Sequence, residues 1–451
     1  MSTRSYSGHI LYLTVLGLLS SGCSSGVTSS IKESIVPVYA FMHKTADNPN
    51  PISSINNNLK TPPLASNIGK IANAALSVSD SRSESKGLVA EREQSLAVLR
   101  FDAKPRLVAS GRVNQFSAFS GSDEVRTGQS FRLGLKQSLL DFGQFASRNE
   151  QAYKELSIAQ IEYWIERNQT VHDALVSYFA IDRQNKLIAL VESFIEKHRT
   201  LKKQITERVR GGVANKSELS VIDIRLNELY LEKDSDQRLL QSARVAFDSE
   251  TELQSIPGVL FADQDFVLDL QVAEDSFAPA VLASSQQVAL ASDRRIEAKS
   301  HKFPGLELDV FVETLGEEAY GIELNVNSDN FSGFSSNAEV RAANLAIESA
   351  EAAFAKTRND FVKEKQQLSM EFTDLLRRKE SLESQHVRTN ESVDLFFEQL
   401  KIGNRPITDA INVYESALFI SRELVVVQSD ILLNRLQAAN ISGTLTAYTD
   451  N

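Results

Sequence analysis

Two long stretches of the chain contain neither proline nor glycine, and they limit the possible folds more than any other feature. One runs from Gln144 to Arg210, and the other runs from about residue 335 to residue 402. An α-helix rises 1.5 Å per residue, so each stretch predicts a helix on the order of 100 Å long. The 451 residues could form several globular domains or one elongated molecule. With only 10 prolines and 20 glycines in the whole chain, the sequence favours long uninterrupted elements.

Each long stretch ends at a glycine that opens a short turn, and the two turns are alike. Residues 212–219 read Gly-Val-Ala-Asn-Lys-Ser-Glu-Leu, and residues 403–410 read Gly-Asn-Arg-Pro-Ile-Thr-Asp-Ala. Glycine supplies the left-handed residue that ends a helix. Asn215 and Glu218 resemble a capping pair, and Pro406 suits the first position of a new helix. We interpret both turns as the tips of helical hairpins, and two such tips after matched helices suggest an internal repeat.

The order of predicted elements occurs twice along the chain. Each half contains a helix, a β-hairpin, a long helix, a tip and a further helix. The predicted division is a first repeat over 67–253, with its hairpin at 105–142 and its tip at 211–217; a linker over 254–276; a second repeat over 277–441, with its hairpin at 304–334 and its tip at 403–408; and a tail over 442–451.

Each predicted hairpin has one apolar and one polar face, because apolar and polar residues alternate along its strands. A strand of about ten residues is long enough to cross an outer membrane when it is tilted. Four strands cannot close a barrel, and an open sheet edge in lipid leaves costly unpaired backbone groups. If these strands lie in a membrane, subunits must therefore associate to complete the barrel. The alternative is that they form the exposed strands of a soluble sheet.

The polar faces of the two hairpins carry opposite charges. If both faces line one lumen, these charges partly compensate each other and produce a wet, polar interior. The residues concerned are Arg112, Arg132 and Lys136 in the first hairpin and Glu307, Asp309, Glu313 and Glu323 in the second.

One histidine falls on an apolar seam of the first long helix. The seam residues recur at spacings of four and three, as in a heptad repeat. They are Leu187, Val191, Phe194, His198, Leu201 and Ile205. His198 could be a ligand or a pH switch, but no second histidine, cysteine or carboxylate pattern stands beside it. A structural role in the seam is therefore the preferred interpretation.

The N-terminus has the features of an export signal. Arg4 precedes an apolar run from Ile10 to Leu19, and small residues lead to Cys23. The run is too short to span a membrane, so residues 1–22 are predicted to be a signal peptide. Small residues before a cysteine resemble a bacterial lipidation site, although the usual leucine stands one position early. We therefore predict that Cys23 is lipidated. The alternative is an ordinary cleaved signal peptide, with a cysteine that is not modified. Ser24, directly after the cysteine, favours location of such a lipoprotein in the outer membrane. Residues 23–66 are predicted to form an extended segment.

Composition and motifs argue against several classes of function. The net charge of −11 argues against a nucleic-acid-binding surface, and the single cysteine excludes an intramolecular disulfide. There is no glycine-rich phosphate loop and no His-Glu-x-x-His helix, and the 6 histidines show no ligand spacing. We therefore predict no enzyme, no catalytic residue, no cofactor and no metal site.

Three sets of residues together resemble one family. They are the stretch Gly-Leu-Lys-Gln-Ser-Leu-Leu-Asp-Phe-Gly at 134–143, the two glycine tips, and the closing stretch 436–445 with Gly443. In this order, and with an internal repeat, they are more specific than any one alone. The chain resembles the TolC family of bacterial outer-membrane efflux and secretion channels over nearly all of its mature length.

The resemblance implies an α+β membrane protein that forms a homotrimer. Four strands from each subunit would form a twelve-stranded β-barrel in the outer membrane. A long α-helical coiled-coil tunnel would continue the barrel through the periplasm. The tips would form the periplasmic entrance, where a membrane-fusion adaptor links the channel to an inner-membrane pump or ABC transporter.

The resemblance also implies roles for residues at the tips. Asp409 aligns with an acidic residue that rings the closed entrance, whereas the family's second acidic position is Asn412 here. We therefore expect one carboxylate ring at the periplasmic gate rather than two. The positions expected to dock the adaptor are Gly212, Val213, Ser217, Gly403 and Thr408.

The function predicted from the sequence is a passive export duct in a tripartite efflux pump or a type I secretion system. The energy would come from the inner-membrane partner. The alternatives are a soluble periplasmic coiled-coil adaptor or scaffold and, third, an envelope enzyme, for which the sequence offers no site. Lipidation at Cys23 would slightly favour efflux over protein secretion.

Overall fold

The computed structural model describes eight ranges of the chain. They are residues 66–81, 83–117, 125–212, 215–253, 278–314, 318–327, 335–401 and 407–448. The predicted signal peptide, Cys23, the linker 254–276, Val213 and Gly403 lie outside these residues. The described helices and strands are α4 Ser66–Asp80, α5 Glu84–Asp102, β1 Arg106–Ser117, β2 Val125–Leu140, α6 Gln144–Arg210, α7 Lys216–Thr251, α8 Pro279–Ser300, β3 Gly305–Thr314, β4 Glu318–Asn327, α9 Ser336–Lys401, α10 Ile407–Ile441 and the 3-10 helix η2 Leu445–Tyr448.

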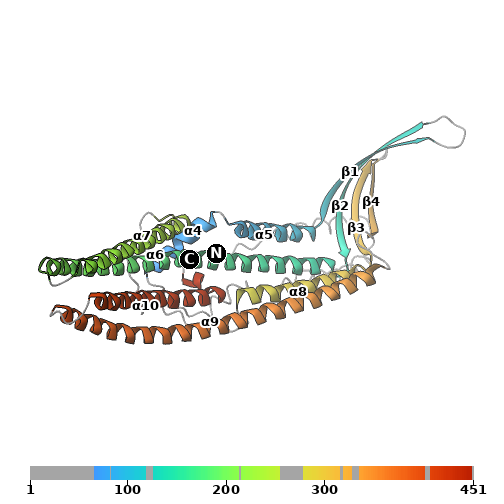
Figure 1. The fold of residues 1–451 in the computed structure, drawn as a ribbon. Helices are drawn as coiled ribbons and strands as arrows, with labels where there is room; N and C mark the ends of the chain where they lie inside the picture. The colour runs from blue at the N-terminus through green and yellow to red at the C-terminus, as the bar shows by residue number, and fades with distance from the viewer. Residues whose placement is uncertain are drawn as a thin grey trace. The chain divides into compact units, whose positions relative to one another are not determined.

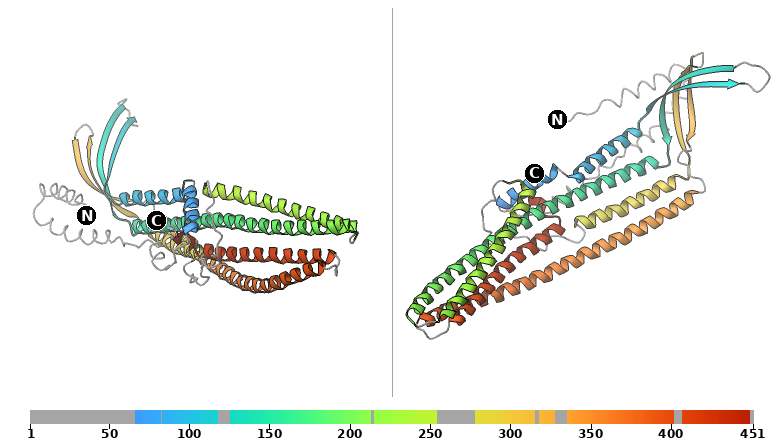
Figure 2. Two further views of the ribbon diagram at one scale, coloured as in Figure 1. Left: turned by 90° about the vertical axis from the view of Figure 1, so that its left-hand side faces the viewer. Right: turned by 45° about the horizontal axis from the view of Figure 1, so that its top comes forward.

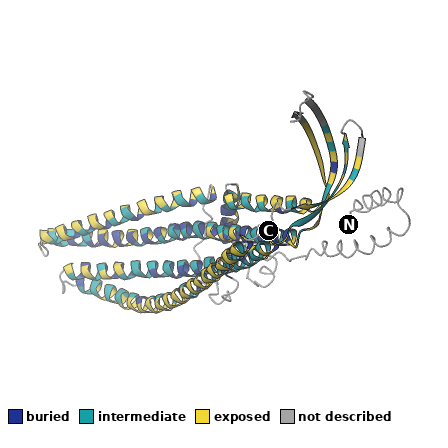
Figure 3. Ribbon diagram, turned by 90° about the vertical axis from the view of Figure 1, so that its right-hand side faces the viewer, coloured by how far each residue is buried: buried dark blue, intermediate teal, exposed yellow. Residues whose placement is uncertain are grey.

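The two long helices lie where the proline-free and glycine-free stretches predict them. α6 has 67 residues and α9 has 66, so each is on the order of 100 Å long. α6 packs against α4, α5, α7, α8 and α10, and α9 packs against α8 and α10 (Figures 1 and 2). Figure 3 shows that α9 is mostly exposed or half-buried along its length. None of the described helices contains an apolar run long enough to cross a membrane.

The seam predicted on α6 is buried. Val191, Leu201 and Ile205 are fully buried, and His198 is 1% exposed. Val191, Leu201 and Ile205 belong to an apolar core shared by α6, α7, α9 and α10. A second core joins α4, α6, α7, α10 and η2, with Phe179 of α6 and Phe247 of α7 among its largest side chains. Burial of such side chains stabilises a fold by about 1.5–3 kcal/mol each.

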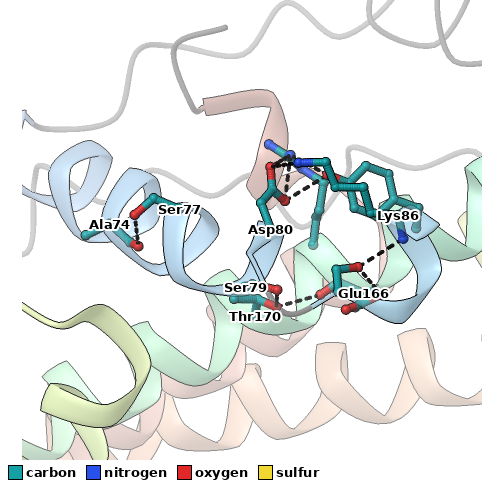
Figure 4. A network of polar contacts seen from close by, with 10 residues as sticks. Ala74, Ser77, Ser79, Asp80, Lys86, Glu166 and Thr170 are labelled. Carbon is teal, nitrogen blue, oxygen red and sulfur yellow. Dashed lines mark hydrogen bonds and ion pairs between the residues drawn. The ribbon is translucent and has the colours of Figure 1, made fainter. Parts of the chain in front are cut away.

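The structure differs from the sequence prediction between α4 and α5. The single helix expected before the first hairpin, from apolar residues at helical spacing over about residues 65–101, is divided in two: α4 ends at Asp80 and α5 begins at Glu84. The Oγ of Ser83 accepts a hydrogen bond from the Lys86 N–H at 3.1 Å and so caps a new helix. Asp80 in turn accepts a hydrogen bond from the Tyr163 hydroxyl of α6 at 2.7 Å and lies 3.4 Å from the Lys86 ammonium (Figure 4). Contacts with α6 thus stabilise the interruption between α4 and α5, which the spacing of apolar residues does not predict.

The four strands form one sheet in the order β1-β2-β3-β4, and every neighbouring pair is antiparallel. The pairing of β2 with β3 joins the two hairpins, with Leu133 opposite Val312 and Leu135 opposite Val310. The apolar side chains of one face are exposed, and Ile322 is 63% exposed. The predicted separation into an apolar and a polar face is therefore present in the sheet.

η2, which follows α10, is held against the middle of α6 by a group of polar contacts. The indole N–H of Trp164 donates to Thr446 Oγ1 at 3.0 Å, and Asn168 Oδ1 accepts from the Leu445 N–H at 2.8 Å. Gly443 has φ 70° and forms a Schellman turn, in which the N–H of the next residue donates to Ala439 at 3.1 Å. The described C-terminal residues thus close back onto the first half of the chain.

We predict that Gly443→Ala destabilises the protein. A Cβ at this position would lie 2.3 Å from Pro279 Cγ and 2.9 Å from the Trp164 ring, and φ is in the left-handed region. Overpacking of this kind costs about 1–3 kcal/mol. Gly87→Ala is the matched control, because Gly87 lies within α5 with nothing within 4 Å of the added carbon. The thermal unfolding midpoint should fall for the first variant and rise or stay constant for the second. Equal midpoints for Gly443→Ala and the unmodified protein would contradict the prediction.

Candidate docking and gating region at the helix tips

Two helical hairpins end on the same side of the structure. α6 meets α7 at one tip, and α9 meets α10 at the other (Figure 1). One apolar core lies beneath both tips, and it includes Ile205, Ile222, Leu400 and Ile407 from the four helices. The tips are therefore supported as one unit rather than as two independent hairpins.

The first tip has the geometry that its sequence predicts. α6 ends at Arg210, and Gly212 is exposed in the left-handed region with φ 71°. Asn215 is the N-cap of α7, and its Oδ1 accepts a hydrogen bond from the Ser217 N–H at 3.4 Å. The Glu218 N–H donates to the backbone oxygen of Asn215 at 3.1 Å. The capping contact of the Asn215 side chain is thus to Ser217 rather than to Glu218.

The described residues of the predicted docking set lie on the outside of the tips. Gly212, Ser217 and Thr408 are all exposed. The roles predicted for Val213 and Gly403 fall on residues outside the described ranges. The described outer surface of the tips thus presents the backbone of Gly212 and the hydroxyl groups of Ser217 and Thr408.

The predicted gate residues lie in the first turns of α10. Asp409 is half-buried in the first turn, and Asn412 is exposed three residues later. A carboxylate in the first turn interacts favourably with the helix dipole, and residues three apart share one face of a helix. Asp409 and Asn412 therefore lie together on one face at the start of α10.

Polar contacts link the two hairpins above the tips. Arg208 at the end of α6 donates from Nη1 to the Leu400 backbone oxygen of α9 at 3.1 Å. Arg225 of α7 lies 3.2 Å from Glu415 of α10, measured from Nε to Oε1. These contacts hold the first hairpin against the second.

A more deeply buried ion pair lies further along the same helices. Arg422 of α10 donates two hydrogen bonds, at 2.8 and 3.1 Å, to the carboxylate of Asp236 on α7. Asp236 is 3% exposed, and its hydrogen bonds raise the pKa of Arg422. Sequence reasoning did not identify this pair. One signal was present: Asp236 follows Ile222, Leu226 and Leu229 at seam spacing, so it is a carboxylate in an apolar seam.

His198 lies between the two hairpins and is packed as a structural residue. Its Nδ1 lies 2.8 Å from the Phe194 carbonyl oxygen, and its ring is 5.3 Å from that of Tyr414 on α10. Burial lowers the pKa of His198, and Arg225 and Lys197 also favour the neutral ring, while the hydrogen bond with the Phe194 carbonyl and the nearby Glu415 oppose this shift. Burial also raises the pKa of Tyr414 to about 12. Both rings are therefore neutral near pH 7.

The described residues contain no cluster of histidine, cysteine, aspartate and glutamate that could hold a metal ion. The polar groups near the tips instead form contacts between helices and cap the start of α7.

No protein-family model matches the chain, and no curated protein matches it in sequence. Several solved structures share its fold. A structure of CusC, described in connection with transmembrane channel formation, aligns with a TM-score of 0.76 at 12% identity and covers 87% of this chain and 94% of its own. The outer-membrane protein VceC of Vibrio cholerae aligns with a TM-score of 0.73 at 14% identity, covering 83% of this chain and 96% of its own. The open-state outer-membrane channel MtrE of Neisseria gonorrhoeae aligns with a TM-score of 0.72 at 16% identity, covering 85% and 91%.

The chain therefore has the fold of TolC-like outer-membrane channels. This finding confirms the resemblance that the sequence motifs predict. At these identities the likeness concerns the fold alone.

We predict that His198 makes the packing of the two hairpins sensitive to acid. An exposed histidine has a pKa of about 6.5, and burial lowers that of His198, so the unfolded chain binds the proton more readily. The neutral ring contributes to the free energy of unfolding. This contribution is fully present above about pH 6.5 and is lost as the pH falls towards the lowered pKa of His198. His198→Leu should therefore reduce the fall in unfolding midpoint between about pH 7.5 and about pH 5. An equal fall in both proteins would contradict this assignment.

Proposed function

We propose that this chain is the outer-membrane channel of a tripartite efflux pump or a type I secretion system. It would act as a passive duct from a periplasmic adaptor to the exterior. The observation that carries the proposal is one antiparallel sheet with an exposed apolar face, continuous in the chain with two helices on the order of 100 Å long. Similarity in fold to outer-membrane channels supports it.

The edges of the sheet support assembly into a homotrimer. β1 and β4 are the outer strands of the four-stranded sheet. In lipid, the backbone groups of both edges would need partners, and strands of neighbouring subunits would supply them. Three subunits with four strands each would form the twelve-stranded barrel implied by the family resemblance. The exposed apolar residues would then contact lipid; they include Phe131, Leu133, Val312, Tyr320 and Ile322.

The arrangement of the tips supports adaptor docking at the periplasmic end. We assign docking to Gly212, Val213, Ser217, Gly403 and Thr408, and the described members of this set are exposed. We assign the gate to a single ring of Asp409 carboxylates, because Asn412 carries no charge. These roles are proposed from the family resemblance together with the position of the described residues at the ends of the hairpins.

The N-terminal assignments complete the proposal. Residues 1–22 would direct export, and lipid on Cys23 would anchor the mature chain to the outer membrane. The division into repeats over 67–253 and 277–441 remains part of this proposal. A soluble periplasmic scaffold is the alternative, and the exposed apolar face of the sheet disfavours it.

Outer-membrane extraction followed by conductance measurement tests the function. We expect a heat-resistant trimer in the membrane extract and ion conductance when this trimer is added to planar bilayers. In the same bilayers, Asp409→Ala should weaken block by divalent cations, because the entrance would lose its carboxylate ring. Recovery of a soluble monomer from the periplasm would reject the channel, whereas unchanged block would reject only the role of Asp409.

We predict that aspartate at either tip glycine abolishes export and leaves the trimer intact. Gly212 is exposed with φ 71°, so Gly212→Asp would strain the turn and place a charge on the docking surface. Gly403→Asp tests the second tip. Ser220→Asp is the control, because Ser220 is exposed on α7 beyond the tip and should export normally. Normal export by both glycine variants would argue against docking at the tips.

A further inference from the structure

One arginine on the polar face of the sheet joins three strands. Arg132 of β2 lies 3.0 Å from the Asp309 carboxylate of β3 and 2.5 Å from the Glu323 carboxylate of β4, both measured from Nη2. A planar guanidinium can bind two carboxylates at once, which a lysine ammonium does less well. Arg132 therefore lies at the centre of the charges on this face.

An aromatic ring beneath the guanidinium holds it in position. The guanidinium carbon of Arg132 lies 3.5 Å from the centroid of the Phe311 ring, within the range of a cation–π contact. Phe311 is paired with Gly321 across β3 and β4, and a Cβ at Gly321 would lie 2.8 Å from Phe311 Cζ. The missing side chain at Gly321 thus lets the ring lie close to the sheet. The Gly321 backbone, the Phe311 ring and the Arg132 guanidinium thus lie in three successive layers.

A second glycine makes room for the acidic partner. Gly134 is paired with Phe311 on the other side, and a Cβ at Gly134 would lie 2.8 Å from Asp309 Oδ1. This Oδ1 is buried and has no hydrogen-bond partner among the described residues. The other oxygen, Oδ2, accepts the hydrogen bond from Arg132. Arg132 is therefore the basic group in direct contact with Asp309, although Lys136 stands opposite Asp309 in the register.

On the polar face, acidic side chains outnumber basic ones around Arg132. Lys136 lies 2.6 Å from the Glu307 carboxylate. Arg132 lies against both Asp309 and Glu323, and its register partner on β3 is a third carboxylate, Glu313. One guanidinium thus faces three acids. Its loss would leave an acidic patch on the polar face.

We propose that Arg132 determines the charge selectivity of the strand-lined part of the duct. This inference rests on the proposed channel function, in which the polar face lines the lumen. The guanidinium offsets the negative charge of Asp309 and Glu323. The strand-lined wall of the duct therefore stays close to neutral, and anionic and cationic solutes both pass. Without it, the wall would concentrate cations and repel anions, as acidic clefts do.

Ion selectivity in planar bilayers tests this assignment, with potassium chloride as the probe. Arg132→Gln should raise the cation-to-anion permeability ratio several-fold relative to the unmodified channel. The shift should shrink as salt rises, because the Debye length falls from about 10 Å at 0.1 M to about 3 Å at 1 M. The double variant Arg132→Gln with Asp309→Asn removes one charge of each sign and should return the ratio towards its original value.

Arg112→Gln is the matched control. Arg112 is exposed on β1 and its position in the register places it on the same polar face, so this variant removes an equal charge without uncovering Asp309. A shift as large as that of Arg132→Gln would overturn the specific role of Arg132, and so would an unchanged ratio in Arg132→Gln.

If Arg132→Gln does not assemble, Glu323→Gln provides the second test, since the Glu323 side chain is 47% exposed and loss of its charge should shift selectivity towards anions. An unchanged ratio in Glu323→Gln would then overturn the proposal, whereas a complete lack of conductance in the unmodified protein would reject the channel itself.

Discussion

The packing of five helices against α6 is the interaction on which the rest of the structure depends. α4, α5, α7, α8 and α10 all contact this helix, and its buried residues continue from Gln144 to Ile205. A helix of 67 residues has no comparable stability in isolation, because most helical stability in proteins comes from packing of an apolar face. α6 therefore provides the common surface that holds both halves of the chain together.

The two ends of this assembly have different chemistry. Near the tips apolar packing dominates, and further along the same helices the buried pair of Asp236 and Arg422 adds a directional contact between α7 and α10. Buried ion pairs of this kind often specify an arrangement more than they stabilise it, since desolvation offsets much of the attraction. At the sheet, apolar side chains are exposed on one face and charges gather on the other. The proposed duct, with one end in the membrane and the other at an adaptor, would require this difference.

The tips illustrate how far local sequence reasoning extends. Gly212 and Asn215 could be assigned in advance because helix ends need a left-handed residue and a capping side chain, and both needs are local. The break after Asp80 was not assigned: the Ser83 cap and the Lys86 ion pair are local, but Asp80 is also bound by Tyr163 and Arg167 of α6, more than eighty residues away. His198 could be placed in the seam from spacing alone, but its contact with Tyr414 required the second hairpin.

The sequence by itself determined the lengths of α6 and α9, the position of the first tip, the two-faced strands and the opposite charges of the two hairpins. Each of these follows from periodicity, from glycine and proline placement, or from the side chains of one segment. Only the tertiary structure decided that β2 pairs with β3, and hence that Arg132 meets Asp309 and Glu323 over the ring of Phe311. These partners are 177 and 191 residues from Arg132 in the chain. Their meeting depends on how α6, α8 and α9 pack, because that packing brings the two hairpins side by side.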